Sequence, residues 1–267
     1  DEGEERMSLI LALDSSRRRG GSVALAEGRK LLALVEHDPA LGYAEAFFGL
    51  ADRALETAGR TRGEIAQLAV VTGPGSYTGL RIGVMTAKSL AHAGGLALFG
   101  CTSLELLAGQ ALLGPEGAGE TPSPKTAKPA RVLALMEAGR EAVYAAVYEL
   151  HDHTLQCVRS PWRALFSSLQ DELRNESALD LVSADGEETL GLARDAASEL
   201  LEGRKILKPT PLASTLALAV GAQCHWCERV DPAALLPVYL GPSQAERAAG
   251  IKVKDEQLRS FDKRRSR

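Results

Sequence analysis

Short apolar segments separated by glycine-containing turns open the chain. Residues 8–13 are almost continuously apolar, which is typical of a buried β-strand. Residues 22–26 and 31–36 are similar, and the two intervening turns contain Gly20-Gly21 and Glu27-Gly28. Glycine suits the tight turns of β-hairpins, so this pattern predicts three strands joined by two hairpins.

Helices and strands alternate over the next seventy residues. In residues 43–58 the apolar side chains recur at steps of three and four, which predicts an amphipathic helix ended by Gly59. We expect a strand at 65–72, a glycine-rich loop, a helix that runs to about residue 93 and a short strand at 96–99. Thr102 and Glu105 then have the spacing of a capping box, which predicts that another helix begins there.

Residues 114–129 contain three Gly and four Pro, which predicts a linker or a long loop. Beyond it we expect strands at 131–136, 141–150 and 179–183, and helices at 187–201 and 212–229. The order of elements predicts an α/β protein of two lobes, each with a mixed β-sheet flanked by helices. The expected divisions are an N-terminal lobe at 7–110, a Gly/Pro-rich insert at 111–130, a C-terminal lobe at 131–240 and a tail at 241–267.

The composition of the 267 residues excludes some classes of protein. A formal net charge of −4 gives no overall basic field for gripping nucleic acid. No apolar run approaches the roughly 20 residues that a membrane-spanning helix needs. Four cysteines in a chain of this length are not a disulfide framework, so we expect reduced thiols and a cytoplasmic protein.

The glycine-rich loop Gly73-Pro74-Gly75-Ser76-Tyr77-Thr78-Gly79 lies between a predicted strand and a predicted helix. Glycines expose backbone N–H groups, and a helix N-terminus adds partial positive charge, so the loop suits an anion. It lacks the Lys-Ser/Thr of a Walker loop, and its glycine spacing differs from the dinucleotide-binding fingerprint. A plain strand-to-helix connection, in which glycine is needed for packing, explains the loop equally well.

Asp14 ends the first predicted strand and is followed by Ser15 and Ser16. A carboxylate in this place can face a phosphate-bound metal ion or a water molecule. It can also simply cap a turn. Together with Gly73, Gly75 and Ser76, these three residues form our candidate set for a vestigial nucleotide or anion site.

Metal ligands are sparse along the chain. No two of the five histidines have the i, i+4 spacing of a zinc helix, and they are His37, His92, His151, His153 and His225. Cys224 and Cys227 form a lone Cys-x-x-Cys within a predicted helix, without the further ligands of a structural zinc site. We therefore expect no metal, and we expect the Cys224–Cys227 segment to pack in the core.

One face of the helix after the glycine loop carries almost no side-chain bulk. This stripe consists of Gly79, Gly83, Ala87 and Ala91. Another helix can approach it closely, either from the same chain or from a partner. Phe47 and Phe48 are adjacent on the helix at 43–58 and cannot both lie at the centre of one buried stripe. We therefore predict a partner interface made of these six residues.

Five segments together resemble the TsaB family, also called YeaZ and formerly known as glycoprotease-like. They are Leu9–Ser16, Ser22–Leu25, the loop Gly73–Arg81 with Gly83 and Ala87–Ala91 after it, the strand and turn around Val132–Tyr148, and Pro237–Leu240. The chain departs from the family in residues 42–45, where a His-Ser-Glu-like stretch is common, and at Gly241, where Arg is common.

The resemblance implies an actin-like, ribonuclease-H-like ATPase fold and a subunit without catalytic residues. It implies binding to the paralogous TsaD, which transfers a threonylcarbamoyl group to the tRNA adenosine beside the anticodon, and joining of the ATPase TsaE. A homodimer is expected when TsaD is absent, and tRNA contact only through the complex. No cofactor is expected, apart from a weakly held nucleotide at a partner interface.

Two enzymatic functions compete with this scaffold. One is a kinase or hydrolase of actin-like fold that uses Asp14 and the glycine loop on a nucleotide. Such an enzyme needs a glycine pair and a phosphate loop in the second lobe, of which Asp185-Gly186 is a thin remnant. The other is a glycoprotease-type peptidase, which the sequence disfavours because it shows no nucleophile with a base or metal site.

Overall fold

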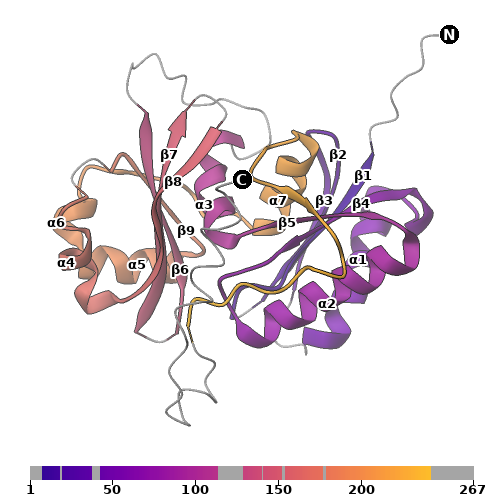
Figure 1. The fold of residues 1–267 in the computed structure, drawn as a ribbon, viewed down its shortest axis with the longest axis horizontal. Coiled ribbons are helices and arrows are strands. Elements are labelled where there is room, and N and C mark those ends of the chain that lie inside the picture. The colour runs from indigo at the N-terminus through magenta and orange to yellow at the C-terminus, as the bar shows by residue number, and fades with distance from the viewer. Residues whose placement is uncertain are drawn as a thin grey trace.

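The computed structural model describes residues 8–18, 20–37, 43–113, 129–139, 141–151, 154–176 and 179–241, with backbone alone for 43–48. Two separate mixed β-sheets form the body of the protein, each with helices beside it (Figure 1). The predicted α/β fold class is therefore confirmed. The insert at 114–128 and the tail from 242 lie outside the described residues, so the predictions about them stay predictions.

The first sheet has six strands in the order β11-β5-β4-β1-β2-β3. Its members are β1 (Leu9–Asp14), β2 (Ser22–Glu27), β3 (Lys30–Glu36), β4 (Ile65–Val71), β5 (Ala97–Cys101) and β11 (Glu228–Val230). The three strands β1 to β3 pair antiparallel as two hairpins, as the sequence predicts. Both β4 and β5 run parallel to β1, because a helix connects each of them to the strand before it.

Helices α1 (Tyr43–Ala58) and α2 (Tyr77–Gly94) pack beside this sheet, and a short 3-10 turn, η1 (Arg62–Glu64), precedes β4. Both helices were predicted from the sequence. Ser76 caps α2, since its Oγ accepts a hydrogen bond from the backbone N–H of Gly79 at 3.2 Å. Gly95 ends the helix in a left-handed conformation at φ 61°.

The second sheet has five strands in the order β10-β9-β6-β7-β8. They are β6 (Ala130–Glu137), β7 (Ala142–His151), β8 (Thr154–Leu165), β9 (Leu181–Ala184) and β10 (Lys205–Ile206). Four short helices accompany this sheet: η2 (Phe166–Ser168), α4 (Leu169–Leu173), α5 (Glu187–Ala196) and α6 (Ser198–Leu201). The predicted single helix at 187–201 is thus two helices. The sequence did not predict β8, because this edge strand is largely exposed and carries polar residues.

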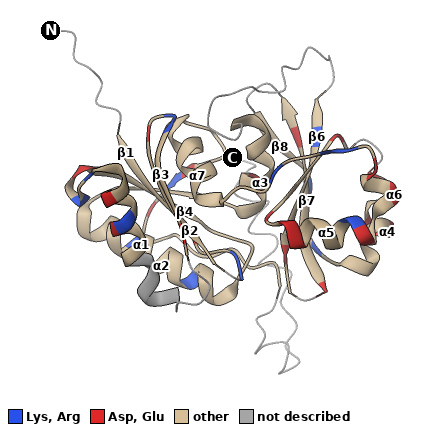
Figure 2. Cartoon of the chain, turned by 180° about the vertical axis from the view of Figure 1, so that it is seen from behind, with Lys and Arg blue, Asp and Glu red and all other residues tan. Residues whose placement is uncertain are grey.

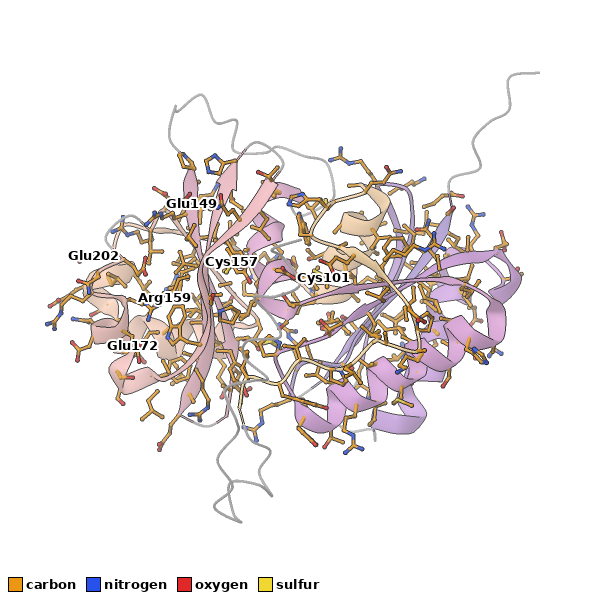
Figure 3. All side chains as sticks on the ribbon, viewed as in Figure 1. Cys101, Glu149, Cys157, Arg159, Glu172 and Glu202 are labelled. Carbon is orange, nitrogen blue, oxygen red and sulfur yellow. The ribbon has the colours of Figure 1, made fainter. Side chains whose placement is uncertain are left out.

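Arg159 on β8 makes an ion pair and a cation–π contact at the exposed side of this edge strand. Its guanidinium lies 3.1 Å from Glu172 of α4 (Figure 3). The same group lies 3.7 Å from the ring centroid of Trp162. A cation over an aromatic ring adds roughly 0.5–1 kcal/mol at an exposed site. Elsewhere acidic and basic residues are distributed over both halves of the chain (Figure 2). None of the described helices is long and apolar enough to cross a membrane.

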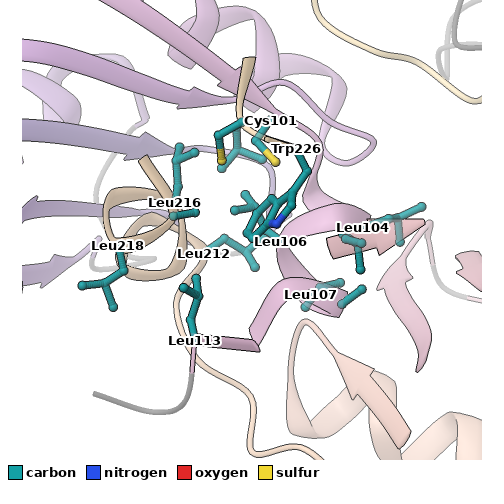
Figure 4. Close-up of a cluster of buried hydrophobic side chains, with 14 of the residues drawn as sticks. Cys101, Leu104, Leu106, Leu107, Leu113, Leu212, Leu216, Leu218 and Trp226 are labelled. Carbon is teal, nitrogen blue, oxygen red and sulfur yellow. The ribbon is translucent and has the colours of Figure 1, made fainter. Parts of the chain in front are cut away.

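Helices α3 (Ser103–Leu113) and α7 (Leu212–Gly221) lie between the two sheets. All residues of α3 are buried, and so are those of α7 from Leu212 to Val220. Thr102 and Glu105 form the predicted capping box, since the Glu105 carboxylate accepts hydrogen bonds from Thr102 N and Oγ1. One continuous hydrophobic core joins both helices with side chains from both sheets (Figure 4).

The predicted helix at 212–229 is wrong beyond residue 221. At Gly221 a side chain would collide with the backbone of Gly28, so α7 ends against the β2–β3 turn. Gln223 then adopts a left-handed φ of 55°, and residues 224–227 form a turn that leads into β11. The expected core packing of this segment holds for Trp226 and Cys227, which are 2% and 8% exposed.

The contact between Trp226 and Gly109 of α3 gives a test of the core. A Cβ atom on Gly109 would lie only 2.5–2.7 Å from two ring carbons of Trp226. Gly109→Ala should therefore destabilise the protein by about 1–3 kcal/mol in urea unfolding. Gly191 of α5 has open space around it, so Gly191→Ala should instead stabilise by about 0.4–1 kcal/mol. Equal effects of the two substitutions would contradict this packing.

Candidate functional site

Asp14 and the glycine loop lie at the same edge of the first sheet. Asp14 ends β1, and the loop follows β4, the parallel neighbour of β1. The backbone N–H of Ser76 donates to the carbonyl of Ser16 at 2.6 Å. Gly75 lies so close to the backbone of Ser16 that no side chain fits there. The structure therefore brings the two parts of the candidate set into direct contact.

The Asp14 side chain closes a turn. Its Oδ1 accepts hydrogen bonds from the backbone N–H of Ser16 at 2.8 Å and from Ser16 Oγ at 2.6 Å. Asp14 is 0% exposed, and its Oδ2 has no hydrogen-bond partner among the described residues. Burial raises the pKa of this carboxyl, while the bonds from Ser16 oppose the rise. This geometry matches the turn interpretation rather than an exposed general base.

Ser15 points the other way, toward helix α2. A side chain at Gly83 would meet Ser15 Oγ, and one at Gly79 would meet the Ser15 carbonyl. Ala87 and Ala91 continue this face and are 0% and 2% exposed. The prediction that these four residues form a partner interface is therefore wrong. Their small size lets α2 approach β1 and β4 within the same chain.

Phe47 and Phe48 completed that predicted interface. Their side chains lie outside the described residues, so their part in a partner contact stays a prediction.

The polar groups of the glycine loop are bonded within the chain. The carbonyl of Gly73 accepts from the backbone N–H of Ser103 at 2.9 Å, and the Pro74 carbonyl accepts from Ser103 Oγ at 2.6 Å. The N–H groups of Ser76 and Gly79 donate to Ser16 and Ser76 as described above. Gly73 is at φ 116°, which favours glycine. The geometry favours a packed connection, and anion binding here stays a prediction.

The C-terminal segment packs on this loop, which the sequence did not predict. The backbone N–H of Val238 donates to the Thr72 carbonyl at 2.7 Å, directly before Gly73. The ring of Tyr239 stacks on Tyr77 with centroids 4.6 Å apart. Burial, together with Tyr77, raises the pKa of Tyr239 to about 12. The Pro237–Leu240 resemblance was the only signal in the sequence that marked this segment.

Asp185 lies at the corresponding edge of the second sheet, directly after β9. It is 6% exposed, and its Oδ2 accepts a long hydrogen bond of 3.4 Å from the backbone N–H of Glu137. Burial raises the pKa of this carboxyl as well. A second buried carboxylate therefore directly follows β9 of the other sheet. In the sequence, this position was noted only as part of the dipeptide Asp185-Gly186, a thin remnant of a phosphate loop.

The described residues contain no cluster of three His, Cys, Asp or Glu side chains that could hold a metal ion. His37 is buried and His151 lies 3.5 Å from Glu149, whereas His153 lies outside the described residues. Cys224, His225 and Cys227 line a cavity of about 850 Å³. This cavity also contacts Ser8, so it lies at the end of β1 opposite to Asp14.

A protein-family model described as "TsaD: tRNA N6-adenosine threonylcarbamoyltransferase" matches residues 40–189, more than half of the chain. The chain belongs to the TsaD family. A curated TsaD relative from Brucella ovis, named tRNA N6-adenosine threonylcarbamoyltransferase, is 38% identical over 95 residues. That match covers 30% of this chain and 26% of the relative, and a Brucella suis relative matches equally. The chain thus spans about a quarter of the length of the curated relatives it matches.

Solved structures resemble a much larger part of the chain. YeaZ from Pseudomonas aeruginosa is 25% identical with a TM-score of 0.61, and the match covers 88% of this chain and 100% of YeaZ. A second Pseudomonas aeruginosa structure, described as similar to peptidase YeaZ, gives 24% and 0.60 over the same shares. These matches confirm the TsaB (YeaZ) resemblance noted in the sequence.

The fold extends to more distant proteins. An activator of 2-hydroxyisocaproyl-CoA dehydratase from Clostridium difficile, solved with bound ADPNP, is 10% identical with a TM-score of 0.51, and the match covers 81% of this chain and 95% of the activator. At this identity only the fold is shared, and it is the predicted actin-like ATPase fold.

The buried carboxylate of Asp14 predicts a distinct dependence of stability on pH. Its pKa is raised on folding from 3.8, so the loss of stability begins above pH 3.8, grows as the unfolded state ionises, and is complete above the folded-state pKa. Below pH 3.8 the group is neutral in both states and this effect vanishes. The free energy of unfolding of Asp14→Asn, relative to wild type, should therefore rise as the pH increases above 3.8 and level off once the carboxyl is also ionised in the folded state.

Glu149→Gln provides a control of opposite sign. Its hydrogen bond from Arg131 holds the pKa of Glu149 below 4.5, so this carboxylate stabilises the fold at neutral pH and the effect is lost in acid. The relative stability of Glu149→Gln should thus fall as pH rises. Urea unfolding at several pH values measures both trends, and a flat profile for Asp14→Asn would contradict the assignment.

Proposed function

We propose that this protein is a non-catalytic subunit that binds TsaD and enables TsaE to join, for threonylcarbamoylation of the tRNA adenosine next to the anticodon. Membership of the TsaD family and the likeness to YeaZ support a role in this modification. The observation that best supports the absence of catalysis is the burial and hydrogen bonding of Asp14. Its side chain is wholly buried and closes a turn.

The surroundings of Asp14 agree with a structural role. Two amides of the glycine loop, those of Ser76 and Gly79, donate to Ser16 and Ser76 within the chain. A general base must come within hydrogen-bond reach of a substrate proton, and Asp14 is shielded from solvent. The proposed subunit therefore contributes surface rather than chemistry, and requires no cofactor of its own.

We place the TsaD contact on the outer side of α2, not on its buried stripe. Three large apolar side chains are exposed there: Tyr77 at 39%, Met85 at 57% and Leu236 at 61%. We call these three residues the outer patch. Leu236 belongs to it because Lys88 Nζ donates to the Leu235 carbonyl at 3.0 Å, which holds the C-terminal segment beside α2. Exposed apolar groups rimmed by polar ones are typical of protein–protein interfaces.

The same patch suits a second copy of this chain. A symmetric contact between two outer patches would form the homodimer expected when TsaD is absent. Contact with tRNA would then come only through the complex.

Met85→Arg tests the assignment. Since Met85 is exposed, the variant should keep a near-normal melting temperature and lose at least about ten-fold in affinity for purified TsaD from a related bacterium. It should also fail to support threonylcarbamoylation when mixed with TsaD and TsaE. Binding is measured by calorimetry and modification by nucleoside analysis of tRNA.

Leu192→Arg is the matched control, because Leu192 is 38% exposed on α5 of the second sheet. It should bind TsaD as wild type does.

Ala87→Arg, in contrast, places a charge at a fully buried position and should prevent stable folding. Normal TsaD binding by Met85→Arg would move the interface elsewhere. Failure of the folded wild-type chain to bind TsaD would refute the proposed function itself.

A further inference from the structure

Cys224 and Cys227 lie at the two ends of a hydrogen-bonded turn between α7 and β11. The backbone N–H of Cys227 donates to the carbonyl of Cys224 at 3.0 Å. In such a β-turn the first and fourth Cα atoms lie less than about 7 Å apart, and a disulfide joins residues whose Cα atoms are roughly 4.4–6.8 Å apart. Both thiols are free in the structure. The turn therefore brings them into the range of a disulfide.

Contacts on both sides fix this turn in place. The backbone N–H of Cys224 donates to the carbonyl of Ala219 at 2.9 Å, which ties the turn to the end of α7. Trp226, between the two cysteines, is 2% exposed and packs against Gly109 of α3 in the core (Figure 4). Because its backbone is anchored in this way, the turn holds the two cysteines near each other rather than letting them separate.

The cavity of about 850 Å³ opens onto both cysteines. Cys224 is partly exposed and Cys227 is 8% exposed, so a reagent in the cavity meets Cys224 first. His225 and Arg229 also line the cavity, and no Asp or Glu is among the described residues that line it. Arg229 is ionised at neutral pH, so the charge of the lining favours a reagent that is itself negatively charged.

We propose that Cys224 and Cys227 form a site of reversible oxidation, which a small anionic disulfide of the glutathione type oxidises from within the cavity. The Cys224 thiol loses its proton to water, and the thiolate attacks one sulfur of the reagent, from which one thiolate leaves. The thiolate of Cys227 then attacks the Cys224 sulfur, and the second reagent thiolate leaves. The cysteines lose two electrons, which reduce the reagent to two thiols. The proposal does not depend on TsaD binding.

The surroundings of the pair determine how fast it reacts. Burial and, to a smaller extent, Cys227 raise the pKa of Cys224 to about 11, whereas Arg29 of the β2–β3 turn opposes the rise. His225 and Arg229 are the other titratable groups at the cavity. Only about one Cys224 thiol in 10⁴ is therefore ionised at pH 7, and the reaction should accelerate about ten-fold per pH unit from pH 7 to 10. A thiol of high pKa is also a poor leaving group, so the disulfide should be reduced slowly once formed.

The test is peptide mapping of the folded wild-type chain after incubation with glutathione disulfide at about pH 9. The main product should be a Cys224–Cys227 link, with the loss of one hydrogen atom from each thiol. Cys227→Ser should stop at a mixed disulfide of glutathione with Cys224, because the second thiol is missing. Cys157 is the matched control, since it is also partly exposed, and Cys157→Ser should form the link at the wild-type rate.

A second comparison tests entry through the cavity. Arg229→Gln should slow the reaction with glutathione disulfide at least about three-fold and should not slow the reaction with cystamine, a cationic disulfide. A link that appears only after the chain is unfolded in urea would overturn the proposal. Equal slowing with both reagents, or a rate that does not change between pH 7 and 10, would overturn it as well. If Cys227→Ser does not fold, the mapping of the wild-type chain still decides the outcome.

Discussion

Burial of α3 and α7 on all sides is the constraint on which the rest of the structure depends. A helix that is apolar all round is stable in water only when other elements cover every face. Here each central helix has a sheet on one side and the other helix beside it, so the facing sides of the two sheets share one core. Gln110 sets the alignment within this apolar layer, since its amide lies within 3.3 Å of both Thr215 of α7 and Ser183 of β9.

The packing of α3 and α7 between the sheets also determines where the residues of the candidate site lie. The helices hold the sheets side by side, with the buried Asp14 directly after β1 in one sheet and the buried Asp185 directly after β9 in the other. Ligands of open α/β sheets bind at these ends. In this protein the turn after β1, the glycine loop and residues 237–240 pack on one another there. Hydrogen bonds within the chain join the glycine loop to Ser16, Ser103 and Val238, which supports the proposed non-catalytic role.

The proposed partner surface consists of apolar side chains of α2 and the C-terminal segment that the core leaves exposed. Gly79 and Gly83 on one side of α2 pack against Ser15. The bulky side chains of Tyr77 and Met85 therefore lie on the exposed side of the helix. The C-terminal segment then adds Leu236 beside them. Membership of the TsaD family supports the proposal that this patch contacts TsaD.

The sequence by itself determined the local elements and the family. The hairpins, α1, α2 and the capping box of Thr102 and Glu105 depend on periodicity and turn residues, which act over a few positions. It could not decide whether Gly83 and Ala87 face a partner or their own sheet, because a small-residue stripe suits either. It also could not separate α7 from β11, since Gly221 ends the helix only by meeting Gly28. Only the tertiary structure showed that Gly79 and Gly83 pack against Ser15, because residues so far apart in the chain meet through the packing of α2 on β1.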